Sequence, residues 1–173
     1  MINFIQNMLK IKKSRIVFFI ILFIFILLSD RYTKFLIKKN FELGESKNIF
    51  FEFIRITYIE NNGIVFGMFN EYGKFFLYST PIILIIILVY FIKYEEKNFL
   101  TLLAFTLIIA GACGNILDRF IWGAVVDFID IDIPDINLPF YHLSRWPAFN
   151  IADSAISVGI VILLIYSLKR KNK

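Results

Sequence analysis

Four long apolar runs dominate the chain, at residues 16–28, 75–92, 99–117 and 148–168. A helix needs about 17–25 mostly apolar residues to cross the hydrocarbon core of a bilayer, and the last three runs reach that length as they stand. The first run is shorter and must continue through Asp30 to about residue 36. The pattern therefore predicts four spans, at approximately 14–36, 75–92, 99–117 and 148–168.

The two longer segments between these runs, 38–74 and 118–147, predict a small β-sheet. In residues 48–69, Phe51 and Phe53 alternate with Glu52, and Asn62-Gly63 is a strong hairpin-turn signal. Residues 64–69 would then form the return strand. Residues 125–133 also have a strand pattern, whereas residues 134–147 contain three prolines and predict a loop.

The alternation within 125–133 assigns its side chains to two faces of the strand. Asp130 and Asp132 share one face, and Asp127 shares the other with Ile129 and Ile131. We expect Asp130 and Asp132 to be solvated. Asp127 points to the apolar face, where a carboxylate requires a partner.

Composition and charge place the chain in a membrane. Hydrophobic residues make up 58% of it, against about 45–50% in soluble domains. No small-residue cleavage site follows Leu28, so the first run predicts a retained helix rather than a signal peptide. We expect one membrane-embedded domain, residues 1–173, mainly α-helical, with four transmembrane helices and a small outward-facing β-sheet.

Basic residues flank the first and last runs, which predicts that both termini are cytoplasmic. These residues are Lys10, Lys12, Lys13 and Arg15 before the first run and Lys169, Arg170, Lys171 and Lys173 after the last. They account for the net charge of +5. No basic face of a folded domain is visible, so we expect membrane lipids as partners and no nucleic acid.

The acidic residues near the outer helix ends are the candidate catalytic groups. Asp153 begins the last apolar run, where a carboxylate costs about 2.5–3.5 kcal/mol on insertion scales. One hypothesis is an aspartyl dyad of Asp127 and Asp153, in which one carboxyl holds a proton and the other is ionised. The alternatives are an ion pair with Arg119 or Lys34 and an exposed acid at the membrane interface. The single Cys113 and single His142 argue against a disulfide, a structural zinc site and a Ser–His–Asp triad.

Asp118 competes with Asp127 for the place in the dyad. Asn115 and Asp118 end the third run with the same Asn-x-x-Asp spacing with which Asn150 and Asp153 begin the fourth. Arg119 follows Asp118 at once and is a natural neutralising partner, which favours a structural or substrate-orienting acid. The pattern alone leaves this choice open.

Other polar positions favour structural roles. Asp30 and Lys34 have the i, i+4 spacing of a favourable helical ion pair. Asn61-Asn62-Gly63 predicts a turn, and Gly111 and Gly114 predict close helix packing.

Two further function classes remain open at this point. One is a small transporter or channel whose acids bind a cation or a proton, and the other is a structural membrane protein. A transporter needs its acids near the bilayer midplane, whereas here every candidate acid lies at an outer helix end. A purely structural role leaves Asn150 and Asp153 unexplained.

Five sequence blocks, in order along nearly the whole chain, resemble the prolipoprotein signal peptidase (type II signal peptidase) family. They are Asp30-Arg31-Tyr32-Thr33-Lys34, Asn61-Asn62-Gly63-Ile64-Val65-Phe66-Gly67, Gly114-Asn115-Ile116-Leu117-Asp118-Arg119, Val125-Val126-Asp127-Phe128 and Phe149-Asn150-Ile151-Ala152-Asp153-Ser154. The chain departs from the family in Ile64-Val65, where Ala-Ala is usual, and in a longer stretch between Asp127 and Asp153.

The resemblance implies an aspartic endopeptidase of the bacterial inner membrane, with Asp127 and Asp153 as the catalytic pair near the outer face. It also implies that globomycin inhibits the enzyme. Its substrates would be diacylglyceryl-modified prolipoproteins, cleaved just before the lipidated cysteine. Neither metal nor organic cofactor is expected, and we expect a monomer. The remaining site residues would bind substrate or support the site, namely Asn115, Asp118, Arg119, Asn150, Asp30, Lys34, Asn61 and Gly63.

Overall fold

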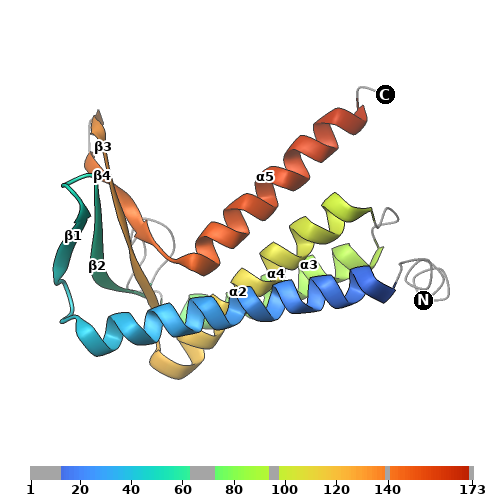
Figure 1. Ribbon diagram of the computed structural model, residues 1–173, viewed down its shortest axis with the longest axis horizontal. Coiled ribbons are helices and arrows are strands. Elements are labelled where there is room, and N and C mark those ends of the chain that lie inside the picture. The colour runs from blue at the N-terminus through green and yellow to red at the C-terminus, as the bar shows by residue number, and fades with distance from the viewer. Residues whose placement is uncertain (1–12, 63–72, 94–97, 139–140, 172–173) are drawn as a thin grey trace. The chain divides into compact units, whose positions relative to one another are not determined.

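The computed structural model describes residues 13–62, 73–93, 98–138 and 141–171. These residues form four α-helices and four β-strands (Figure 1). The helices are α2 (Lys13–Asn40), α3 (Gly73–Lys93), α4 (Phe99–Trp122) and α5 (Ile151–Lys171). The strands are β1 (Ser46–Phe50), β2 (Ile54–Asn61), β3 (Val125–Leu138) and β4 (Tyr141–Phe149).

The chain divides into two compact units. The helical unit comprises Met1–Asp30, Tyr78–Ile116 and Ile151–Lys173, and the sheet unit comprises Arg31–Leu77 and Leu117–Asn150. Within the described ranges, three helical segments are long and apolar enough to cross a membrane, namely Lys13–Asn40, Phe99–Trp122 and Ile151–Lys169. The expected span at 75–92 is helical, but its apolar part, Tyr78–Lys93, is shorter. The span at 75–92, and with it the total of four spans, therefore stays a prediction.

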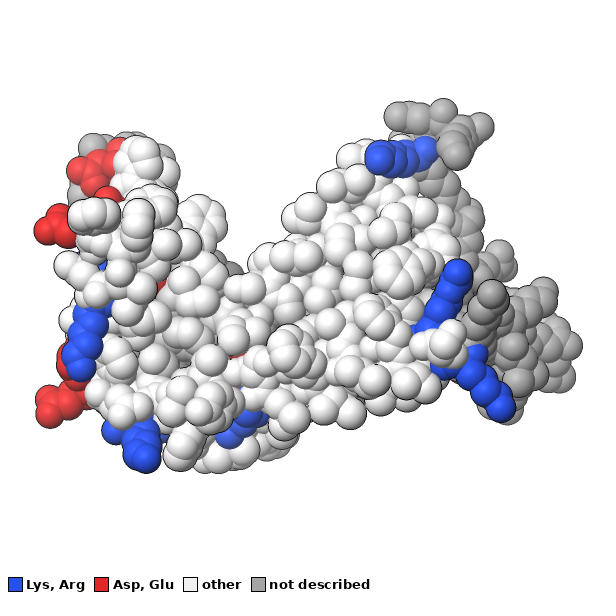
Figure 2. All heavy atoms as spheres, in the orientation of Figure 1, with Lys and Arg blue, Asp and Glu red and all other residues white. Residues whose placement is uncertain are grey.

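Small residues pack the helical unit together. Ile26, Ala110 and Ala155 form a buried cluster. A Cβ atom on Gly159 would lie 2.7 Å from the carbonyl oxygen of Ala104, so the two backbones approach as closely as glycine allows. The outward surface is apolar as well, with Phe25 66% exposed, and Figure 2 shows a broad uncharged area along the helices. Such a surface suits a lipid solvent.

The sheet unit holds an antiparallel sheet of order β1-β2-β3-β4. Strands β1 and β2 form a hairpin whose turn is at residues 51–53, where Phe53 donates its N–H to the carbonyl oxygen of Phe50. This turn interrupts the single strand expected between residue 48 and Asn61, so that strand prediction was wrong. The expected turn at Asn62-Gly63 stays a prediction. Asn61 ends β2, while Gly63 and residues 64–69 lie outside the described residues.

The predicted loop at 134–147 was also wrong, because β3 continues to Leu138 and β4 covers most of the remainder. Proline lacks an N–H donor and is tolerated in a sheet at edges and bulges. Pro147 lies in β4, the edge strand, and the register between β3 and β4 shifts beside both Pro147 and Pro134. The irregular pairing therefore accommodates both prolines.

The strand faces of β3 are as predicted. Ile129 and Ile131 pair with Ile56 and Ile54, and Asp130 pairs with Arg55 on the other face. However, Asp130 is not solvated, since it is only 5% exposed. The alternation identified the face but could not show that two arginines cover it. Asp132 fits the expectation better, because its side chain stays 49% exposed.

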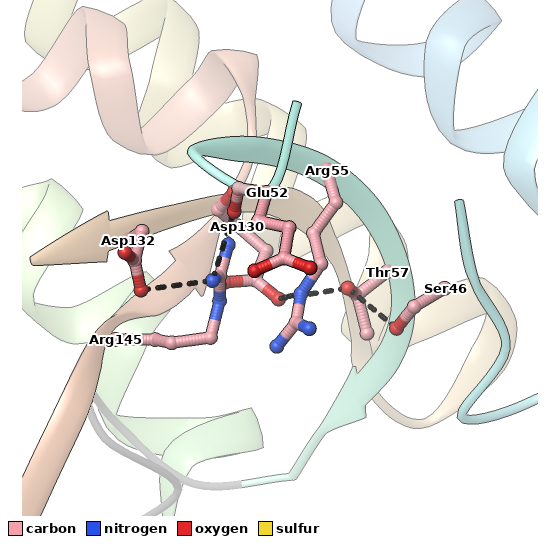
Figure 3. Close-up of polar contacts among 7 residues, drawn as sticks. All are labelled: Ser46, Glu52, Arg55, Thr57, Asp130, Asp132 and Arg145. Carbon is pink, nitrogen blue, oxygen red and sulfur yellow. Dashed lines mark hydrogen bonds and ion pairs between the residues drawn. The ribbon is translucent and has the colours of Figure 1, made fainter. Parts of the chain in front are cut away.

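Asp130 is the centre of a polar cluster on this face of the sheet (Figure 3). It accepts hydrogen bonds from Arg145 Nε at 2.5 Å, Arg55 Nε at 2.7 Å and Thr57 Oγ1 at 2.8 Å. Burial acts to raise the pKa of Asp130, but the hydrogen bonds from Arg145, Arg55 and Thr57 outweigh it, and the pKa lies below its ordinary value. One carboxylate thereby joins β2, β3 and β4.

Replacing this carboxylate should loosen the sheet. We expect Asp130→Asn to cost about 2–4 kcal/mol, because it breaks a buried charge pairing with two arginines. Thermal unfolding in detergent and hydrogen exchange of β2 and β3 amides measure the loss. Asp132→Asn is the matched control, and an equal effect of both substitutions would contradict the central role of Asp130.

Acid should loosen the same sheet. Since the folded-state pKa of Asp130 is depressed, its contribution is fully present above the unfolded pKa of about 3.9 and is lost as pH falls through the folded value. Unfolding temperatures of the wild type should therefore fall more steeply below about pH 4 than those of Asp130→Asn. Parallel pH curves for the two proteins would refute this linkage.

Candidate active site

Asp153 lies in the first turn of α5, in the helical unit. Its Oδ1 accepts a hydrogen bond from Asn115 Nδ2 of α4 at 2.7 Å. The positive end of the helix dipole also favours an acid in this turn. Asn115 and Asp153, two predicted site residues 38 positions apart, are thus brought together.

The start of α5 is held by Asp30 of α2. Asp30 is fully buried, and its Oδ1 accepts a hydrogen bond from the backbone N–H of Ala152 at 2.9 Å. Backbone N–H groups in the first turn of a helix have no partner within the helix, and this carboxylate supplies one from 122 residues away. A Cβ atom on Gly114 would lie 2.7 Å from Asp30 Oδ2, so glycine leaves room for the acid beside α4.

Asp127 belongs to β3 in the sheet unit and is only 3% exposed. Asn61, the last residue of β2, donates from Nδ2 to Asp127 Oδ2 at 3.0 Å. Asn150, which directly precedes α5, donates from Nδ2 to Asp127 Oδ1 at 2.8 Å. Both carboxylate oxygens therefore accept from the amide of a predicted site residue.

A bulge in β2 lies opposite Asp127. Along β2, the pairing with β3 shifts between Ile56 and Ile59, and Asp127 lies opposite Ile59. Such bulges turn side chains in directions that regular pairing does not allow, and they are common beside active sites. Nothing in the sequence signalled this bulge.

Asp118 is a fully buried acid with cationic partners from α2. It forms ion pairs with Arg31 and with Lys34, whose Nζ lies 2.7 Å from Asp118 Oδ2. The backbone N–H of Val126, just before Asp127, also donates to Asp118 Oδ2, at 3.2 Å. Asp118 thus ties α2 and β3 to the end of α4.

Arg31 and Lys34 neutralise Asp118, and the expectation that Arg119 also does so stays a prediction. Neighbouring residues on a helix point in different directions, and Arg119 lies in the last turn of α4 itself. Sequence reasoning missed Arg31, although its i, i+3 spacing to Lys34 places both cations on one face of α2. The Arg31 guanidinium also lies over the ring of Trp122, 4.2 Å from its centroid.

The structure thus locates most predicted site residues. Gly63 lies outside the described residues. Among the described residues, no group of three or more His, Cys, Asp or Glu side chains is arranged to hold a metal ion. The available chemistry is that of carboxylates oriented by asparagine amides, which donate hydrogen bonds without adding charge.

Comparison with known proteins identifies the family. Residues 22–169 match the family model described as signal peptidase (SPase) II. A lipoprotein signal peptidase of Syntrophus aciditrophicus (strain SB) is 37% identical over 166 residues, covering 93% of this chain and 98% of the relative. A lipoprotein signal peptidase of Staphylococcus aureus (strain JH9) is 36% identical over 150 residues, covering 87% of each chain.

Solved structures agree with these matches. Two structures described as bacterial membrane enzymes superpose with TM-scores of 0.78 and 0.74, at 35% and 36% sequence identity. The first match covers 90% of each chain, and the second covers 89% of this chain and 94% of the other. The chain is a multi-pass membrane peptidase by class. It belongs to the signal peptidase II family, as the five sequence blocks predicted.

The buried ion cluster around Asp118 should control stability. We expect Asp118→Ala to destabilise the protein by about 3–5 kcal/mol, because it removes the carboxylate that faces two cations. Thermal unfolding of purified protein in detergent measures this loss. Lys47→Ala is the control, since it removes an exposed pair with Glu45 that is worth no more than about 1 kcal/mol. Similar unfolding temperatures for both variants would contradict the assignment.

Proposed function

We propose that this protein removes the signal peptide from bacterial prolipoproteins that carry diacylglycerol on the lipobox cysteine, cutting just before that cysteine. Membership of the signal peptidase II family, and relatives named lipoprotein signal peptidase, support the removal of signal peptides from prolipoproteins. The cut position and the diacylated substrate come from the resemblance of the five sequence blocks.

The catalytic pair in this proposal is Asp127 and Asp153. The observation that carries it is that each carboxylate accepts a hydrogen bond from the amide of an asparagine in a family block, at 2.7–3.0 Å. Amide donors fix the orientation of a carboxylate without the full charge of a lysine or arginine. Asp118, by contrast, is paired with two cations, and this favours Asp127 over Asp118 as the partner of Asp153.

The reaction is acid–base hydrolysis of an amide bond. The ionised carboxylate takes a proton from water while the water oxygen bonds to the scissile carbonyl carbon, and the protonated carboxyl hydrogen-bonds to the carbonyl oxygen. The resulting tetrahedral intermediate collapses when the amide nitrogen receives a proton and the C–N bond breaks. The signal peptide leaves with a carboxyl terminus, and the lipoprotein keeps its lipidated cysteine as its first residue.

The remaining predicted residues support this chemistry. Asn61, Asn115 and Asn150 orient the two acids. Arg119 lies one turn beyond Asn115 on α4 and positions substrate. Asp30, Lys34 and Asp118 hold the elements that carry the acids, and Gly63 follows the end of β2. The reaction uses neither metal nor organic cofactor.

The proposed setting is the bacterial cytoplasmic membrane. Both termini lie in the cytoplasm and the acids lie near the outer face, so the lipid chains of the substrate stay in the bilayer while the scissile bond meets water. The protein acts as a monomer with four spans, and globomycin inhibits it at the catalytic pair.

The dyad is tested by isosteric substitution. Asp127→Asn and Asp153→Asn should each lower cleavage of a purified diacylated prolipoprotein by at least about a hundredfold, because each removes a titrating group. Electrophoresis of the product follows signal-peptide release, and unfolding temperatures verify that the variants are folded. Asp132→Asn, at a half-exposed acid of the same strand, should keep full activity. Full activity in either dyad variant would remove that residue from the mechanism.

The protonation state of the pair predicts the pH profile. Only the singly protonated dyad can both activate water and polarise the carbonyl, so the cleavage rate should be bell-shaped in pH. EDTA should leave the rate unchanged. Loss of activity on EDTA treatment, with recovery on addition of zinc, would contradict the metal-free mechanism.

A further inference from the structure

The turn between β1 and β2 carries an exposed apolar cluster, which we term the aromatic tip. It consists of Ile49, Phe50, Phe51 and Phe53, which are 51–81% exposed. Scattered exposed apolar residues are ordinary, but a contiguous group marks a surface that contacts something apolar. Among the described residues, none buries these side chains.

The backbone of the tip is held in an unfavourable shape. Phe51 has a φ of 48°, in the left-handed region that a bulky side chain seldom adopts. It is nevertheless the most exposed residue of the tip, at 81%. Strain that presents a side chain outward, without gaining core packing, is typical of recognition surfaces.

The one charged residue of the turn is Glu52, which Figure 3 draws together with the polar cluster. The Glu52 carbonyl oxygen also accepts a hydrogen bond from Arg145 at 3.1 Å. This hydrogen bond ties the backbone of the turn to the polar cluster.

The tip lies within reach of the bilayer that contains α2. Residues 41–45 alone join α2 to β1, a link of at most about 18 Å. Lys38, near the end of α2, also bonds to two side chains of β2, at 2.8 Å to Tyr58 Oη and 2.5 Å to Glu60 Oε1. Figure 1 shows β1 and β2 running across the end of α2, within the same unit, rather than continuing along its axis.

We propose that the aromatic tip inserts into the interfacial layer of the bilayer that α2 spans. Strands that run across the end of a spanning helix follow the membrane surface, so the tip stays at the level of the headgroups. An apolar, uncharged tip gains there by leaving water, as the apolar faces of interfacial helices do. This anchor concerns phospholipid and does not depend on the proposed peptidase activity.

Spin-label accessibility tests the proposal in full-length protein reconstituted into phosphatidylcholine nanodiscs without substrate. In a Cys113→Ala background, nitroxides are attached at Phe51→Cys and Phe53→Cys. Asp135→Cys, at an exposed acid of β3, is the aqueous control. Collision rates with oxygen, which concentrates in lipid, and with a water-soluble nickel chelate are then compared.

Both tip labels should collide with the nickel chelate several-fold less than the label at position 135, and with oxygen more. Equal access to the nickel chelate at all three positions would overturn the proposal. Protection from both reagents would also overturn it, because the tip would then be buried against protein. No step requires cleavage, so failure of the proposed function would leave this result unaffected.

Discussion

The buried charge of Asp118 is the constraint on which the sheet unit depends. Its side chain has no solvent exposure and neither has that of Lys34, so both charges have lost their hydration. Such groups persist in a low dielectric only when paired and hydrogen-bonded. Arg31 and Lys34 supply the positive charge, and the N–H of Val126 supplies a further donor. The residue that follows Val126 is Asp127, so the ion cluster and the proposed catalytic acid are adjacent along the chain.

In the helical unit, Asp30 likewise holds a backbone N–H group. Asp30 accepts from the N–H of Ala152, one residue before Asp153. Each proposed catalytic acid thus follows a backbone N–H that a fully buried carboxylate holds. The supporting acids have partners from other elements, and the proposed catalytic acids accept from neutral asparagine amides. The acids that hold backbone N–H groups are therefore distinct from the acids proposed for catalysis.

The sheet uses its two faces for different purposes. The face with Asp130, Arg55 and Arg145 is closed by ion pairs that lock three strands together. The other face carries the isoleucines of β2 and β3 together with Asp127. Locking the first face keeps β3 in register, which matters because a slip of one residue would move Asp127 to the opposite face.

The sequence by itself determined the apolar helices, the faces of β3 and the family to which the chain belongs. These follow from local periodicity and from residue types in fixed order. Only the tertiary structure decided that Arg31 and Lys34 neutralise Asp118, that Asp30 holds the start of α5, that Asp130 is buried, and that β4 is a strand despite its proline. Each of these depends on partners far apart along the chain. Alternation shows which way a side chain points, but the partner that covers it is set only when distant segments pack, because burial and charge pairing are properties of the folded surroundings.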